Sequence, residues 1–63
     1  MQLSELKKYA EEMSAKHPHL DEQIRDFYFL AIDEVESGES ESHECELAVS
    51  DIESLILENE NND

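Results

Sequence analysis

The stretch LDEQIRDFYFLAIDEV, residues 20–35, decides the fold because it holds both Phe residues, one of the two Tyr residues and the densest run of large apolar side chains. On a helix, at about 100° per residue, its apolar side chains form one stripe, which Leu30 and Ile32 widen on either side. A face this wide needs more than one neighbouring helix to cover it. The residues of the stripe are Leu20, Ile24, Phe27, Tyr28, Ala31 and Val35.

Both segments that flank this stretch have the apolar spacing of amphipathic helices. Apolar residues recur every three or four positions over residues 3–16, and again over residues 42–58. With the central helix at 20–36, the sequence predicts an all-α fold with one domain, residues 1–58: a small three-helix bundle of up-down-up order. Residues 59–63 are expected to be a disordered acidic tail. A dimer of helical hairpins, with the first helix loosely docked, is the structural alternative.

Turn-forming residues mark the boundaries of the central helix. Either Pro18 occupies the first helical position or Asp21 caps the helix slightly later, and the sequence leaves both starts open. The helix should end just before Gly38, the one residue here that adopts a left-handed cap without steric cost. Ser40 or Ser42 then offers an N-cap for the third helix.

The charge of the chain is strongly asymmetric. Four Lys and Arg residues against 18 Asp and Glu residues give a net charge of -14 with His neutral. Residues 1–32 carry all four bases and six acids, whereas residues 33–63 carry twelve acids and no base. Such a field repels nucleic acid and anionic membranes and attracts basic protein surfaces or cations. We therefore expect no direct binding to nucleic acid or to membranes.

Cysteine usage and chain length limit the compartment and the chemistry. The single Cys45 excludes an intrachain disulfide, the first 16 residues lack the apolar core of a signal peptide, and no apolar stretch is long enough to cross a bilayer. These features favour a reducing cytoplasm. A chain of 63 residues also has little room for a dry pocket around a catalytic carboxylate, so we expect neither enzymatic activity nor a cofactor.

Two patterns suggest a metal site. His17 and His19, together with His43 and Cys45, add up to four plausible zinc ligands, and residues 33–44 share acids and a central Gly with a calcium-binding EF-hand loop. In the expected bundle the two ligand pairs lie at opposite ends of the central helix, roughly 25 Å apart. An apolar residue fills a ligand position of the calcium pattern. We therefore predict no metal site, and a metal-binding module is kept as the second alternative function.

The acidic surface is the remaining candidate for function, although a solvated coat is its simplest interpretation. Carboxylates along a helix can imitate the spacing of phosphates, so a surface that binds nucleic acid can accept such a protein instead. We expect a non-enzymatic protein that docks on a basic surface of a protein partner and can block nucleic-acid access. The carboxylates expected to make this contact are Glu36, Glu39, Glu41, Glu44, Glu46, Asp51 and Glu53.

Three large apolar residues, Phe29, Leu47 and Leu57, point away from the centres of the predicted stripes. Side chains in such positions are either scattered surface residues or parts of an interface. A small core benefits from extra burial. A structural or assembly protein that self-associates through these three residues is therefore the first alternative function.

One further indication of function is a likeness in the second half of the chain. The segment SESHECELA, residues 40–48, is followed by the pairs 51–52 (DI) and 55–56 (LI) and preceded by the aromatic-rich run FYFLA, residues 27–31. In these features the chain resembles small acidic proteins encoded in tailed-bacteriophage genomes. The resemblance implies a phage origin and an intracellular role, and it transfers no site residues. Phage products of this kind often occupy a host protein's surface, which favours the partner hypothesis by analogy.

Overall fold

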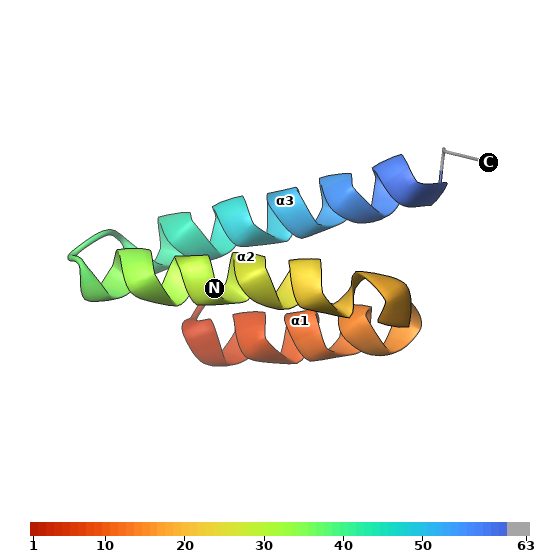
Figure 1. Ribbon diagram of the computed structural model, residues 1–63. Coiled ribbons are helices and arrows are strands. Elements are labelled where there is room, and N and C mark those ends of the chain that lie inside the picture. The colour runs from red at the N-terminus through yellow and green to blue at the C-terminus, as the bar shows by residue number, and fades with distance from the viewer. Residues whose placement is uncertain (61–63) are drawn as a thin grey trace.

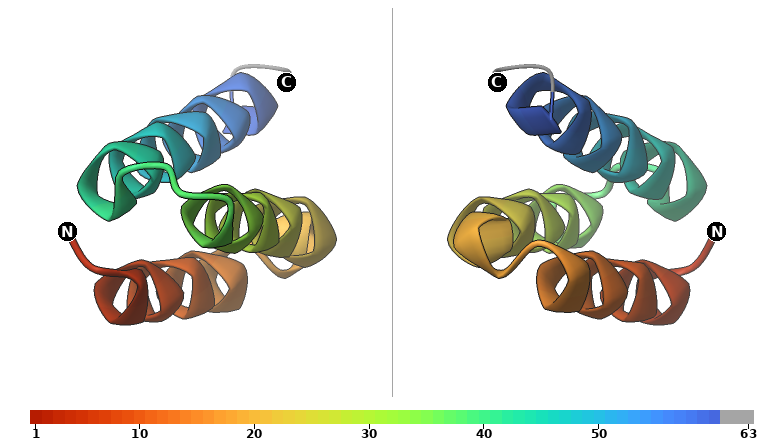
Figure 2. Two further views of the ribbon diagram at one scale, coloured as in Figure 1. Left: turned by 90° about the vertical axis from the view of Figure 1, so that its left-hand side faces the viewer. Right: turned by 90° about the vertical axis from the view of Figure 1, so that its right-hand side faces the viewer.

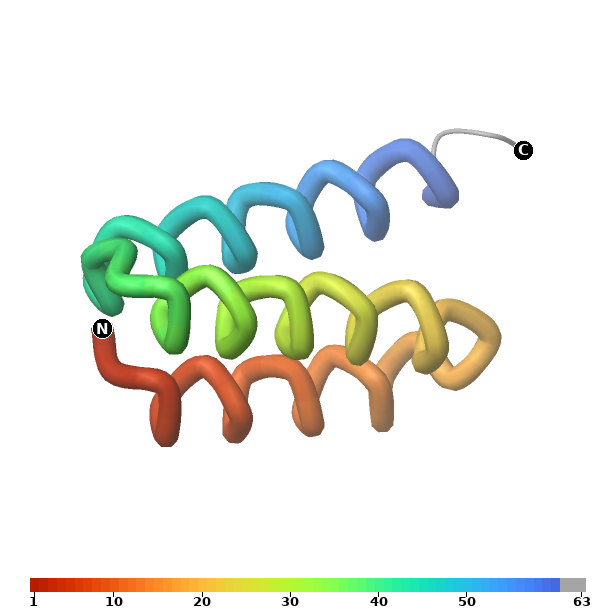
Figure 3. The backbone as a smooth tube through the Cα atoms, turned by 60° about the vertical axis from the view of Figure 1, so that its left-hand side comes forward, coloured from red at the N-terminus to blue at the C-terminus, as the bar shows by residue number. Residues whose placement is uncertain are grey.

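The computed structural model describes residues 1–60, which form three α-helices and one short 3₁₀ turn. Helix α1 spans Leu3–Lys16, the turn η1 spans Pro18–Leu20, α2 spans Asp21–Glu36 and α3 spans Glu41–Glu60. The helices run up, down and up, and α3 tilts away from α1 toward its C-terminal end (Figures 1 and 3). Viewed end on, they occupy the corners of a triangle (Figure 2). The predicted all-α fold and three-helix bundle are confirmed.

The helix boundaries agree with the predicted ones to within two residues. Pro18 takes the first position of η1, where its missing N–H removes no hydrogen bond, and α2 follows directly. Asp21 is therefore no cap: its carboxylate instead accepts a hydrogen bond from Arg25 Nε at 3.1 Å. Helix α3 continues through Glu60, beyond its predicted end. The rest of the predicted tail, residues 61–63, lies outside the described residues.

The turn between α2 and α3 satisfies the last carbonyl groups of α2. The N–H groups of Gly38 and Glu39 donate to the carbonyls of Val35 and Glu34, at 3.0 and 3.1 Å. This pair of bonds is the Schellman motif, which needs a residue of positive φ at its centre. Gly38 has a φ of +106°, the only positive φ among the described residues. Its predicted role is confirmed, and Ser40 occupies the N-cap position that follows.

The core consists of two clusters, each of which takes side chains from all three α-helices. The predicted apolar stripes supply every buried residue, but Leu30 is 54% exposed, so its expected place at the edge of the core is wrong. It lies about 120° around α2 from Ile24, beyond the side that α3 covers. The buried residues are Leu6, Ala31, Cys45 and Ala48 in one cluster and Ala10, Leu20, Ile24 and Ile52 in the other.

Candidate functional site

The side of α3 that faces solvent has a regular arrangement of charge. An uncharged ridge runs along it, with residues spaced alternately four and three positions apart, so that they lie in one line on the helix. All five ridge residues are exposed: His43, Leu47, Ser50, Ser54 and Leu57. A row of carboxylates flanks the ridge on each side, and both rows repeat every seven residues. The rows are Glu46, Glu53 and Glu60, and Glu44, Asp51 and Glu58.

The charge density of α3 is closer to that of a single nucleic-acid strand than to that of a duplex. The helix carries seven carboxylates and no Lys or Arg over its 20 residues. At a rise of about 1.5 Å per residue, this gives one negative charge per roughly 4 Å. Double-stranded DNA carries one per about 1.7 Å and each of its strands one per about 3.4 Å.

The seven carboxylates predicted to contact a partner do not share one face. Four of them belong to the rows on α3: Glu44, Glu46, Asp51 and Glu53. Glu36 and Glu39 are exposed at the turn between α2 and α3. The rows also include Glu58 and Glu60, which sequence reasoning missed because Glu58 is the last residue of the predicted helix and Glu60 falls in the predicted disordered tail. Their spacing of seven residues from Asp51 and Glu53 is the signal that could have identified them.

Glu41, the remaining predicted contact residue, makes a hydrogen bond between α3 and the start of α1. Its Oε2 accepts a hydrogen bond from the backbone N–H of Leu3 at 2.7 Å, so a side chain from α3 satisfies the first turn of α1. A carboxylate also suits the positive end of the α1 dipole. Within α1 itself, Glu5 Oε1 accepts the N–H of Gln2 at 3.1 Å. Both carboxylates therefore stabilise the same helix end.

The three residues expected to drive self-association are exposed, but Phe29 lies on a different side of the bundle from Leu47 and Leu57, which both belong to the ridge on α3. The exposed fractions of Phe29, Leu47 and Leu57 are 55%, 45% and 58%. Phe29 lines a groove between α1 and α2, whereas Leu57 lines another between α1 and α3. Leu47 belongs to the ridge on α3 and lines neither groove. The three side chains therefore do not form one patch.

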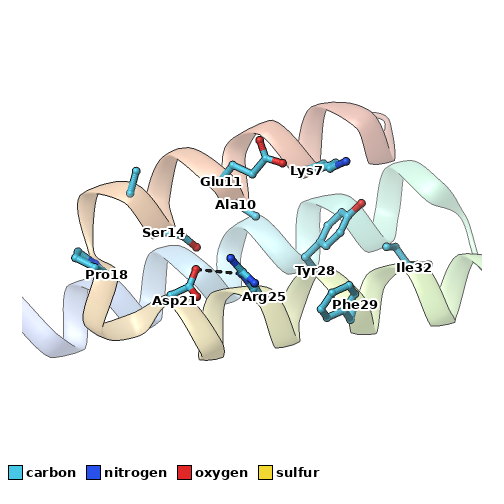
Figure 4. A pocket seen from close by; sticks show the side chains of 11 residues that line it. Lys7, Ala10, Glu11, Ser14, Pro18, Asp21, Arg25, Tyr28, Phe29 and Ile32 are labelled. Carbon is cyan, nitrogen blue, oxygen red and sulfur yellow. Dashed lines mark hydrogen bonds and ion pairs between the residues drawn. The ribbon is translucent and has the colours of Figure 1, made fainter.

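The two grooves differ in their charged residues. The groove between α1 and α2 has a volume of about 710 Å³ and contains two bases and two acids (Figure 4). The groove between α1 and α3 has a volume of about 590 Å³ and contains two acids, Glu53 and Glu60, and no base. Partial burial, and secondly the nearby Glu53, raise the pKa of Tyr9 in this second groove. The acidic character of α3 thus extends to its border with α1.

The residues of the zinc pattern lie at the two ends of the bundle. The ring centroids of His17 and His19 are 6.3 Å apart in an edge-to-face arrangement, in the corner between α1 and α2. His43 and Cys45 lie in the first turns of α3, at the other end of the bundle (Figure 1). Burial, followed by the neighbouring Glu41, raises the pKa of the Cys45 thiol, which is the opposite of what a thiolate ligand or nucleophile requires. Within residues 1–60 no three His, Cys, Asp or Glu side chains are grouped as a metal site.

The start of the calcium pattern is helical. Residues 33–36 belong to α2, so the first four positions of the pattern lack the loop conformation that an EF-hand needs.

Among the described helices, none combines the length and the apolar character needed to cross a membrane. No protein-family model matches the sequence, and no curated protein or solved structure is significantly similar to it.

Proposed function

We propose that this chain is a non-enzymatic binding protein whose solvent-facing side of α3 docks on a basic surface of a protein partner. The observation that supports this function is the order of the carboxylates: two rows of seven-residue period flank a ridge that exposes Leu47 and Leu57. A solvated coat needs charge but no such order. The ridge supplies apolar contact area, and the rows supply charge on both sides of it.

The partner surface that fits this arrangement is an apolar stripe flanked by Lys or Arg. In coiled coils, apolar residues at spacings of three and four form the seam, and charges on either side of it select the partner. A basic amphipathic helix has this surface. Two copies of α3 would instead place carboxylates against carboxylates, so pairing of α3 with itself is disfavoured.

Occupation of a nucleic-acid-binding surface is the biological effect that we propose. The charge density of α3 is near that of one nucleic-acid strand, so a groove that tracks a single strand is the best match. The buried thiol of Cys45 fits a reducing compartment, and we place the interaction in the cytoplasm. The resemblance to phage-encoded acidic proteins suggests a host protein as the partner.

The test combines capture of partners with reversal of charge on the rows. Tagged protein is incubated with bacterial lysate at low and moderate salt, and retained proteins are identified by mass spectrometry. The variant E46K/D51K/E53K reverses three carboxylates in the rows. We expect it to lose a basic, nucleic-acid-binding protein that the unmodified chain retains at low salt and releases as salt rises.

A matched control separates the proposed face from the net charge. The variant E12K/E22K/D26K reverses three exposed carboxylates on α1 and α2 and changes the net charge by the same amount. It should retain the partner. If both triple variants lose the partner equally, only the net charge matters, and the proposed face is wrong. If neither variant loses it, the contact lies elsewhere.

A further inference from the structure

The groove between α1 and α2 exposes a large aromatic side chain next to apolar walls. Its walls include Ala10, Tyr28, Phe29 and Ile32 (Figure 4). The rings of Tyr28 and Phe29 lie 5.6 Å apart, and Phe29 remains 55% exposed. Ser14 also lines the groove, and its Oγ is buried without a hydrogen-bond partner. The ring of Phe29 is therefore open to contact at this groove, whereas the Oγ of Ser14 is already covered by the chain itself.

The charges at this groove are balanced, unlike those of α2 and α3 as a whole. Lys7 and Glu11 lie on the α1 side, and Arg25 and Asp21 on the α2 side. Helix α1 as a whole carries three Lys and three Glu, for a net charge of zero. Helix α2 carries six acids and one base, for a net charge of -5. A surface that covers this groove therefore meets the least repulsion if the part that lies on α2 is not itself acidic, and α1 has this property.

We propose that a second copy of the chain covers this groove, with a two-fold axis parallel to it, so that α1 of each copy lies on α2 of the other. In this arrangement the lysines of one copy's α1 approach the acids of the other copy's α2. Glu11 and Arg25 line the middle of the groove from opposite walls (Figure 4). Glu11 of each copy therefore meets Arg25 of the other.

The position of α3 is what favours a second copy as the occupant. In the triangle of helices, α3 lies opposite the groove between α1 and α2 (Figure 2). Two copies that meet through this groove keep their most acidic helices on the outer sides of the dimer. Like-charge repulsion between two chains of net charge -14 is then as small as the fold permits. Both acidic faces stay accessible to the proposed partner.

The size of the face suits a weak, reversible dimer rather than a permanent one. Helices α1 and α2 have 14 and 16 residues, so at about 1.5 Å per residue they are roughly 21 and 24 Å long. On a bundle 17 Å wide, the face that they form covers roughly 400 Å² in projection. A standard interface buries about 800 Å² on each partner. Side chains that project beyond the helix axes, Phe29 above all, add to the area. Burial of Phe29 also adds apolar contact to a core that has only four fully buried side chains among the described residues.

Neighbouring residues of equal exposure provide the main test. Phe29 is 55% and Leu30 is 54% exposed, but only Phe29 lines the groove. Sedimentation equilibrium over a range of concentrations should show a reversible dimer for the unmodified chain. The variant F29S should raise the dimer Kd by about tenfold or more, because central aromatic residues dominate such interfaces. L30S should leave the Kd unchanged. Circular dichroism of both variants serves as the control that each is still helical.

An exchange of charges tests the arrangement of the two copies. E11K and R25E should each weaken the dimer by about tenfold, because each places like charges together across the interface. The double variant E11K/R25E should restore the dimer, since the opposite charges then meet again. A chain that stays monomeric up to millimolar concentration overturns the proposal. Equal effects of F29S and L30S, or failure of the double variant to restore association, overturn it as well.

Discussion

The groove between α1 and α2 and the solvent-facing side of α3 are two surfaces on one small core, and they differ in how charge accompanies exposed apolar groups. Around Phe29 there are two bases and two acids, whereas around Leu47 and Leu57 there are six acids and no base. The net charge of -14 is therefore not a uniform coat. We have proposed a second copy of the chain as the occupant of the first surface and a basic partner for the second.

The largest expected effect tests whether the two surfaces depend on one core. Leu6 is fully buried against residues of α2 and α3. Leu6→Ala should lower the free energy of unfolding by about 2 to 5 kcal/mol, because it leaves a cavity, and thermal melts should show most of the chain unfolded at 37 °C. If α1 were only loosely docked on a hairpin of α2 and α3, the melting temperature would hardly change.

Salt should act in opposite directions on the two surfaces. Ions screen attraction between α3 and a basic partner, so an increase in NaCl from 50 to 500 mM, both chosen for the experiment, should weaken that binding by at least about tenfold. The same increase screens repulsion between two acidic copies, so the dimer should persist or tighten. Isothermal titration with a basic amphipathic peptide and sedimentation at matched salt concentrations measure both. Salt effects of the same sign would mean that the surfaces are not distinct.

A smaller effect concerns the hydrogen bond that joins the start of α1 to α3. Glu41→Ala removes the acceptor of the Leu3 N–H, and the loss of such a cap costs about 1 kcal/mol, or about 4 to 8 °C in melting temperature. Glu39→Ala is the matched control, because it removes the same charge from the neighbouring turn. It should leave the melting temperature unchanged or slightly raised, since it lowers self-repulsion. An equal decrease in melting temperature in both variants would contradict a structural role for Glu41.

The smallest predicted effect is a decrease in stability at alkaline pH. Burial, assisted mainly by Glu41, raises the pKa of Cys45 above its ordinary value of 9.0, so the folded chain keeps its thiol proton at a pH where the unfolded chain loses it. Above about pH 9 the folded state binds more protons than the unfolded state, and the free energy of unfolding falls as pH rises. Urea titrations at pH 7.5 and 9.5 should show this decrease in the free energy of unfolding. In Cys45→Ala the decrease between the two pH values should be smaller, because the thiol no longer contributes to it.

Local pattern predicted most of the fold. Apolar spacing located three helices, and the conformational freedom of Gly38 located the turn after α2. The exposure of Phe29, Leu47 and Leu57 also followed from their angular positions. The exposure of Leu30 did not, because it depends on how far α3 extends around α2. Periodicity states which side of a helix is apolar, but only the packing of neighbours decides how much of that side is covered.

The candidate surfaces were harder to predict than the helices. Sequence reasoning selected acids by their density near residues 36–53, and so it included Glu41 and left out Glu58 and Glu60. The hydrogen bond of Glu41 joins residues 38 positions apart, and no spacing rule reveals such a pair. Likewise, nothing in the sequence assigned Phe29 and Leu57 to different grooves, since that depends on which helices flank each residue.

The hydrogen bond between Leu3 and Glu41 also has a consequence for the order of folding events. Most contacts in a short bundle join residues close in sequence, whereas this bond closes a long loop of chain and forms only when α1 docks beside α3. We expect it to be absent from the folding transition state. Loss of the bond in Glu41→Ala should then leave the folding rate almost unchanged and increase the unfolding rate. The carboxylate of Glu41 would thus slow unfolding without speeding folding.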